Sequence, residues 1–339
     1  MSLLDRRGFL AGAGLSSLAL AGATLPLAPG TAHAATTPPL AFVMNSGGAT
    51  VSVIDMQTRK VVKTLSTLRE PSHWALTPDR SKLFICDAGG NALFFFDPRT
   101  GAALGHQVLA DPYQIGFTPD GRYFVANALR LNFVDIYDGR DLHLVKRLRV
   151  GGMPSHLDFS PDSRWSFNSM QESGTLVSID LTTMKPRWTT RIGSTPAGVL
   201  WHRGKVLCCV MGTNFLVELD PATGAITRRV HTGVGPHNLF VTPDRATLYV
   251  TNRVGGTLAA LDPVTLKLRR TYEMHASGPD DMGVAPDGKL WIALRFREQV
   301  AVLDPVSGHY DTIDVGRSPH GLFLNTLLDR PGRITAETL

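Results

Sequence analysis

The chain has 339 residues, 43% of them hydrophobic, and a formal net charge of +5 at pH 7. Its lysines and arginines form no cluster of five or six, so it lacks the concentrated positive charge of nucleic-acid-binding proteins. Its three cysteines, Cys86, Cys208 and Cys209, are too few and too poorly spaced for a disulfide framework or a C-x-x-C metal site. They lie in apolar strand patterns, and we interpret them as small buried hydrophobic residues.

The first 34 residues have the pattern of an export signal. Residues 6–10, RRGFL, resemble the core of the twin-arginine motif, although Asp5 and Ala11 replace the Ser or Thr and the Lys that usually flank it. A Gly/Ala/Leu-rich run follows, and residues 32–34, AHA, form a small-x-small cleavage site. Glycines interrupt the run and two prolines end it, which argues against a membrane anchor. We therefore predict a removable signal over 1–34 and a periplasmic or secreted mature protein.

The rest of the chain is a repeat of about 42 residues. An aspartate that ends an alternating apolar run recurs at intervals of 40 to 42 residues, at Asp55, Asp97, Asp138, Asp180, Asp220, Asp262 and Asp304. Several copies continue with Pro and then Thr-Gly or Ser-Gly, which is turn chemistry, so these aspartates are predicted to be structural. Short alternating runs at this period are typical of four-stranded propeller blades.

The order of the strands predicts how the ring closes. The repeat begins at Leu40 with the second strand of a blade, and residues 318–324 match a first, innermost strand. The sequence therefore predicts an all-β, seven-bladed propeller of four-stranded blades over 35–325. In this fold the C-terminal innermost strand joins the N-terminal blade, and residues 326–339 form a tail.

One copy of the repeat carries a family resemblance. The sequence LYVTN at 248–252 has FVTPD before it and TLAALDP after it, and weaker copies are YFVAN (123–127), LFICD (83–87) and AFVMN (41–45). This pattern resembles the YVTN β-propeller family, to which YncE-like exported proteins belong. The resemblance implies a rigid disc that binds something at one face or in its axial channel, and some relatives are linked to lactone hydrolysis or redox cofactors. It specifies the fold and not the function.

Candidate functional residues follow the proline that opens each innermost strand. The pairs after these prolines are Ser72-His73, Tyr113-Gln114, Ser155-His156, Ala197-Gly198, His237-Asn238, Asp280-Asp281 and His320-Gly321. Four of the seven blades thus place a histidine there. Since seven innermost strands surround the axis of a propeller, we expect these side chains to meet at one mouth of the channel.

Imidazoles that converge from separate blades resemble the iron or copper sites at the axis of some other seven-bladed propeller enzymes, and this resemblance implies iron or copper before zinc. Neutral imidazole itself suits iron, copper, zinc and nickel. We predict His73, His156, His237 and His320 as metal ligands, with Tyr113, Gln114 and Asn238 as further ligand-binding residues. Two alternatives stay open: a polar or three-ligand binding site, and histidines that only bond a loop carbonyl or water. His73 and His156 are second after the proline whereas His237 and His320 are first, and such neighbours face opposite ways in a regular strand.

Other chemistry is sparse in the sequence. Asp280 and Asp281 are candidates for a general base, although adjacent acids are more often a solvated turn. No G-x-S-x-G, H-E-x-x-H or phosphate-binding G-x-x-x-x-G-K motif occurs. Two further groups of residues are predicted to be solvated. The first group consists of arginines that follow second strands and are expected at the opposite rim: Arg130, Arg253, Arg295 and Arg297. The second group consists of histidines in or beside outer strands: His106, His143, His231, His275 and His309.

Two functional hypotheses follow. The first is a binding module that holds a small molecule, a metal or a protein partner at the histidine-bearing face. The second is an enzyme, either a histidine-ligated iron or copper oxidoreductase or a lactonase-like hydrolase, that uses the same residues. In both cases we expect a monomer with no cofactor other than a transition metal.

Overall fold

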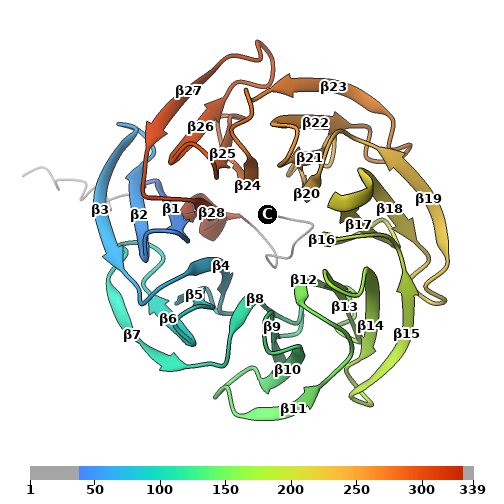
Figure 1. Ribbon diagram of the computed structural model, residues 1–339. Helices are drawn as coiled ribbons and strands as arrows, with labels where there is room; N and C mark the ends of the chain where they lie inside the picture. Colours follow the sequence, from blue (N-terminus) through green and yellow to red (C-terminus); the bar gives the residue numbers. More distant parts are fainter. Residues whose placement is uncertain (1–37, 331–339) are drawn as a thin grey trace, which may run out of the picture. The chain divides into compact units, whose positions relative to one another are not determined.

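The computed structural model describes residues 38–330 as seven four-stranded antiparallel sheets around a central axis (Figure 1). They belong to one compact unit, Thr37–Leu339. The predicted signal, 1–34, and residues 331–339 of the predicted tail lie outside the described residues. The seven-bladed propeller is therefore confirmed.

Each blade runs from an innermost strand to an outermost one. The blade that closes the ring has the order β28-β1-β2-β3, with β1 (Leu40–Asn45), β2 (Thr50–Asp55), β3 (Lys60–Ser66) and β28 (Pro319–Leu324). The next three blades contain β4 (Pro71–Leu76), β5 (Leu83–Asp87), β6 (Ala92–Phe96), β7 (Ala103–Val108); β8 (Pro112–Phe117), β9 (Tyr123–Ala128), β10 (Phe133–Asp138), β11 (Leu144–Leu148); β12 (Pro154–Phe159), β13 (Trp165–Met170), β14 (Thr175–Asp180) and β15 (Lys185–Arg191).

The last three blades repeat this order. They contain β16 (Pro196–His202), β17 (Lys205–Val210), β18 (Phe215–Leu219), β19 (Ile226–His231); β20 (Pro236–Val241), β21 (Leu248–Asn252), β22 (Thr257–Leu261), β23 (Leu268–Glu273); β24 (Pro279–Val284), β25 (Leu290–Leu294), β26 (Gln299–Leu303) and β27 (Tyr310–Asp314). Among the described residues, the helical elements are two short 3-10 turns, η1 (Met211–Thr213) and η2 (Asn325–Asp329). No helix in this part of the chain is long and apolar enough to span a membrane.

The ring closes as predicted. Strand β28 pairs antiparallel with β1, and Phe42 lies opposite Phe323. The side chain of Asn325 holds the two ends together: its Oδ1 accepts the backbone N–H of Leu40 at 2.8 Å, and its Nδ2 donates to the carbonyl of Pro38 at 3.0 Å. The first and last described strands are thus joined in one blade.

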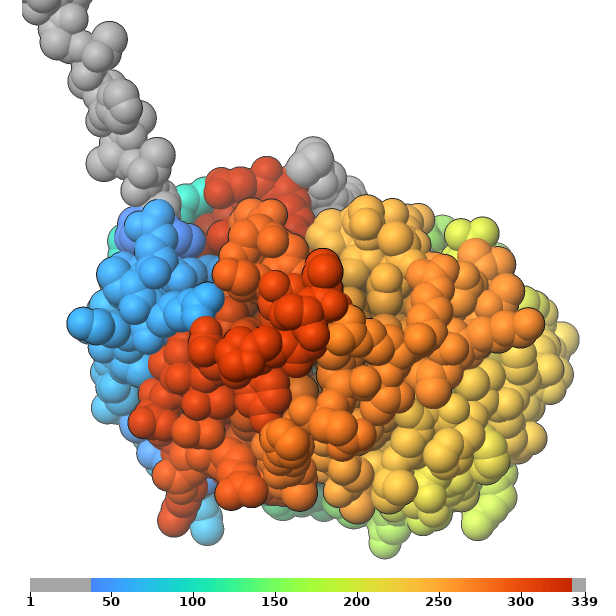
Figure 2. Space-filling model, turned by 90° about the horizontal axis from the view of Figure 1, so that it is seen from above, coloured from blue at the N-terminus to red at the C-terminus, as the bar shows by residue number. Residues whose placement is uncertain are grey.

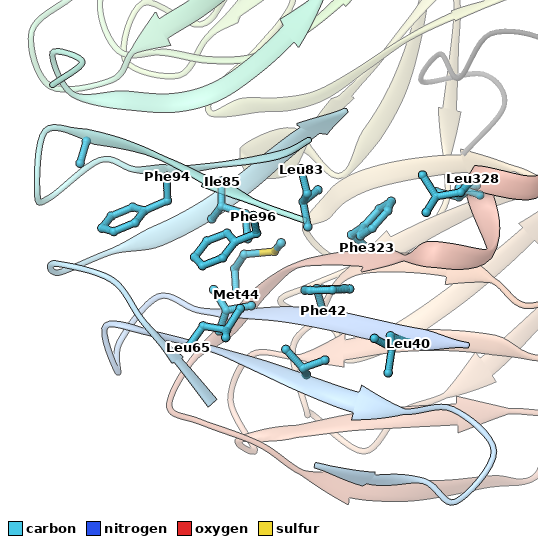
Figure 3. Close-up of a cluster of buried hydrophobic side chains, with 14 residues drawn as sticks. Leu40, Phe42, Met44, Leu65, Leu83, Ile85, Phe94, Phe96, Phe323 and Leu328 are labelled. Carbon is cyan, nitrogen blue, oxygen red and sulfur yellow. The ribbon is translucent and has the colours of Figure 1, made fainter. Parts of the chain in front are cut away.

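The hydrophobic core lies between neighbouring blades. Figure 3 shows one such layer, in which Phe42 and Met44 from β1 face Ile85 and Phe96 from the adjacent blade. Leu328 of η2 belongs to the same cluster, so the first residues of the predicted tail pack onto the ring. In the space-filling view the later blades, yellow to red, lie directly against one another (Figure 2).

The repeated aspartates form turns, as predicted. Oδ1 of Asp97 accepts the backbone N–H groups of Arg99 and Thr100 at 2.7 and 2.9 Å. The other six bond the backbone in the same way. All three cysteines are free and buried, which also confirms the sequence interpretation.

Candidate functional site

The candidate site lies where the seven innermost strands begin. Each of these strands starts at a proline, and the strands surround the axis in Figure 1. The histidines are His73 in β4, His156 in β12, His237 in β20 and His320 in β28. The fold thus brings residues from four separate blades to one end of the channel.

A β-bulge after each proline explains how both histidine positions can face the channel. Pro71 pairs with Asp87 and Trp74 pairs with Ile85, so three steps along β4 match two along β5. The same register shift follows the proline in the other six innermost strands. A bulge sets two residues opposite one and redirects a side chain. The one-residue offset between the two pairs of histidines is therefore compatible with a common site.

The four imidazoles are neighbours around the axis. Their ring centroids lie 5.1 Å apart for His73 and His156, 5.0 Å for His156 and His237, 6.0 Å for His237 and His320, and 4.5 Å for His320 and His73. None of these residues is more than 5% exposed. Imidazoles that share one ion, with bonds of about 2.0–2.1 Å, have ring centroids roughly 4.5–6.5 Å apart. The cluster therefore has the dimensions of a shared ligand site.

Two of the imidazoles keep a nitrogen without a protein partner. Nδ1 of His73 lies 2.9 Å from the carbonyl oxygen of Tyr113, so Nδ1 is the donor and Nε2 carries the lone pair. Nδ1 of His156 bonds Oγ of Ser155 at 2.6 Å, and that hydroxyl also accepts a hydrogen bond from Gln171. Nε2 of His156 is buried with no hydrogen-bond partner. Such an atom is costly to leave unmatched in a folded protein.

Asp280 is the charged centre of the site. It is fully buried, and its Oδ1 lies 2.8 Å from Nδ1 of His237, although the ring N–H is poorly aligned for a hydrogen bond. Arg253 donates to the same Oδ1 at 2.6 Å and also to Nε2 of His237, while Arg295 donates to Oδ2 at 3.2 Å. His320 is more loosely placed, with its Nε2 3.7 Å from Asp280 and 3.5 Å from the hydroxyl of Tyr113.

Burial keeps the imidazoles uncharged. It lowers the pKa of His73 to about 3, and burial together with Arg253 lowers that of His237 to about 4. Burial also holds the pKa values of His156 and His320 well below the ordinary value. For Asp280, burial acts to raise the pKa, but Arg253 and the neighbouring imidazoles lower it well below its usual range. Neutral imidazole and ionised carboxylate are the forms that bind metals.

One buried group of described residues has ligand atoms close enough for an ion as the side chains stand. His237, Asp280 and His320 each offer one atom, and these atoms lie within 4.8 Å of one another. His73 and His156 do not belong to this group, so an ion shared by all four imidazoles requires some rings to turn. A second group, Asp138, Asp141 and His143, lies on outer turns where His143 bonds Asp141.

The other candidate residues have separate roles. Tyr113 belongs to the cluster, with its ring centroid 4.7 Å from that of His73, and burial raises its pKa to about 12. Gln114 and Asn238 instead accept backbone N–H groups, from Leu157 and Leu239 respectively.

Asp281 does not face the imidazoles as an unpartnered base. Its carboxylate accepts the backbone N–H groups of Met282 and Leu322 at 3.0 and 2.9 Å. Burial raises its pKa to about 7, although the Leu322 N–H opposes this shift. The side chain therefore connects one innermost strand to the next.

The expected position of the arginines was wrong. Arg253 and Arg295 follow β21 and β25, which run antiparallel to the innermost strands and so end at the histidine-bearing mouth. Both bond the buried Asp280 and are not solvated on the opposite rim. The direction of the strands could have predicted this position from the sequence. A second strand that pairs antiparallel with the first must end where the first begins. The five histidines expected in or beside outer strands are exposed, as predicted.

Comparisons with known proteins agree with the fold. A family model described as YNCE-like beta-propeller matches residues 7–331. The periplasmic gluconolactonase PpgL of Pseudomonas aeruginosa is 19% identical, with a TM-score of 0.68 over 84% of this chain and 98% of that one. Hydrazine synthase of Kuenenia stuttgartiensis is also 19% identical, with a TM-score of 0.64 over 74% and 88% of the two chains.

A third similar structure is the dihydro-heme d1 dehydrogenase NirN, 16% identical, with a TM-score of 0.64 over 89% of this chain and 78% of that one. At such identities these likenesses show the fold alone. A comparison with curated proteins found no match. The family model, by contrast, covers nearly the whole sequence, and the chain belongs to the YNCE-like β-propeller family.

Proposed function

We propose that this chain is an exported binding protein that holds a transition-metal ion among the imidazoles at the mouth of its axial channel. The observation that carries the proposal is the unpartnered Nε2 of His156 inside a ring of buried, neutral imidazoles. A bound ion would satisfy that nitrogen together with the lone pair of His73. Neutral imidazole is a suitable ligand for iron, copper and zinc, so all three are candidates.

The ligand set follows from the present partners of each ring. His73, His156 and His320 have nitrogens that are free or only loosely engaged, whereas both nitrogens of His237 face charged groups. We propose the first three as the initial ligands, once the rings of His73 and His156 have turned toward the ion, with His237 and Asp280 next to it. Small-molecule or protein partners would then meet the ion from the open side of this face.

A hydrolase that uses Asp280 or Asp281 as its base has less support. Asp280 is neutralised by two guanidinium groups, and its low pKa makes it a weak base. Asp281 already accepts two backbone N–H groups. The likeness of fold to a gluconolactonase does not supply the missing base.

Metal analysis tests the proposal. Purified protein is stripped with a chelator, dialysed against Fe²⁺, Cu²⁺ or Zn²⁺, and its bound metal is measured by mass spectrometry. We expect about one ion per chain for one of these metals, with at least a tenfold loss of affinity in His156→Ala. The matched control is His231→Ala, an exposed histidine of β19, which should bind as the parent does. Trace metal in every preparation, or normal binding by a folded His156→Ala, would contradict the proposal.

Export is tested separately. We expect the mature protein to be recovered from the periplasm with Ala35 as its first residue. Replacing both Arg6 and Arg7 by lysine should keep the full-length chain in the cytoplasm, because the twin-arginine signal depends on that pair. N-terminal sequencing of the fractionated protein measures both outcomes.

A further inference from the structure

Arg253 occupies the place of a cation in the site. Its Nη2 contacts both Nε2 of His237 and Oδ1 of Asp280, two atoms that would otherwise be ligands for an ion. The side chain is 15% exposed, whereas those of His237 and Asp280 are fully buried. Arg253 therefore lies between the buried ligand atoms and solvent.

A metal ion and Arg253 cannot both use Nε2 of His237, which has a single lone pair. The lone pair on His237 Nε2 accepts from the guanidinium, so it can bind an ion only after Arg253 moves away. A doubly charged ion close to the guanidinium would also be repelled strongly in a buried site. Full coordination by four imidazoles thus requires Arg253 to find another partner.

The charges of the site indicate what that partner is. Arg253 and Arg295 carry two positive charges, Asp280 carries one negative charge, and the four buried imidazoles are neutral. An added divalent ion would leave the buried site strongly positive. Uncompensated buried charge is strongly unfavourable, so a bound anion is needed with the metal.

We propose that the site binds its metal together with a small carboxylate, which takes Arg253 away from Asp280 and His237 and so frees His237 as a further ligand. This inference rests on the proposed metal site. A carboxylate fits because a guanidinium binds its two oxygens through parallel N–H bonds. Arg295, whose side chain is 24% exposed, also pairs with Asp280 and would remain its partner when Arg253 moves.

Acetate is a suitable probe because it is a weak metal ligand in solution. Chelator-stripped protein is incubated with the metal found above, with ¹⁴C-acetate, or with both, and then passed through a desalting column. We expect about one acetate per bound ion, retained only when the metal is present. We also expect acetate to tighten metal binding about tenfold, the scale of charge-assisted hydrogen bonds.

Variants assign the effect to Arg253. In Arg253→Met the metal should bind without acetate at least as tightly as in the parent with acetate, and acetate should no longer be retained. The control is Arg149→Met, which removes an exposed arginine bonded to the carbonyl of Leu131, and it should behave as the parent does. Imidazole coordination is followed in parallel by electron paramagnetic resonance of the Cu²⁺ form. When acetate is added, the spectrum should show one more nitrogen ligand, because the imidazole of His237 is freed to bind the ion.

The outcomes separate the two proposals. Metal binding that is equal with and without acetate, and no acetate retained, overturns the carboxylate inference and leaves the metal site standing. Acetate retained equally without metal overturns the coupling between the two. Absence of metal from every preparation, Arg253→Met included, overturns both.

Discussion

The imidazoles of His73 and His320 meet edge to face in the axial channel, with ring centroids 4.5 Å apart and ring planes at 66°. They stand at different positions after their prolines, yet they face each other because both strands carry a bulge there. The two strands, β4 and β28, are neighbours only because the ring is closed.

Close approach of the backbones sets this contact, and Gly321 makes it possible. A Cβ atom on Gly321 would lie 2.3 Å from the carbonyl oxygen of Ser72, the residue before His73. We expect Gly321→Ala to lower the free energy of unfolding by about 1–3 kcal/mol through overpacking and to weaken metal binding. Gly48→Ala is the control, since its Cβ would meet neighbours at 3.4 Å or more. Urea denaturation compares the two, and equal stability would contradict the steric argument.

Asp280 is expected to hold the mouth together. Asp280→Asn leaves Arg253 and Arg295 without their buried counter-charge, and breaking such a pair costs about 3 kcal/mol. The control variant is Asp287→Asn, which makes the same substitution at an exposed aspartate paired with Lys289. It should change the free energy of unfolding by less than about 0.5 kcal/mol. Thermal denaturation of the metal-free proteins measures the difference. Similar melting temperatures for the two variants would show that Asp280 is not a structural centre.

The buried histidines make the metal-free protein sensitive to acid. The pKa of His73 is lowered from 6.5 to about 3 by burial, so below pH 6.5 the unfolded chain takes up a proton that the folded chain does not. The stabilisation that the neutral His73 side chain gives the folded state is complete above pH 6.5 and is lost as the pH falls toward 3. Each such imidazole lowers the free energy of unfolding by up to about 1.4 kcal/mol per pH unit. Denaturation with urea at pH 7.5, 6 and 5 measures this slope.

A comparison of variants isolates the contribution of His73. His73→Gln removes one titrating group and should have a shallower pH slope than the parent. His231→Gln, which changes an exposed histidine, should keep the parental slope. Parallel slopes for all three proteins would rule out this origin of acid sensitivity.

Ring closure depends on a polar contact as well as on strand pairing. Asn325→Ala removes the acceptor for the Leu40 N–H and the donor to the Pro38 carbonyl. Leaving a buried N–H unmatched costs about 1–3 kcal/mol, so we expect a loss of stability in that range. Hydrogen exchange should increase first in β1 and β28, because these strands lose their anchor. Unchanged exchange there would contradict the role of Asn325 in closure.

Much of the fold could be predicted because every blade carries its own signals. Apolar alternation, the Asp turn near Asp97 and the proline before His73 are local features that recur at the blade period. The strand at 318–324 matched an innermost strand, so closure onto the N-terminal blade followed from counting. The positions of the histidines also followed, since equivalent residues of a closed ring surround its axis.

The sequence by itself thus determined the seven blades and the mouth at which the histidines gather. Only the tertiary structure decided how the four imidazoles face one another. Their orientation depends on β-bulges, and these bulges arise from pairing between the first and second strands of each blade, such as β4 and β5. The tertiary structure also decided that Arg253 bonds Asp280 and His237 across two blades. Such contacts join residues whose relative orientation depends on packing between blades, and no local pattern in one repeat encodes them.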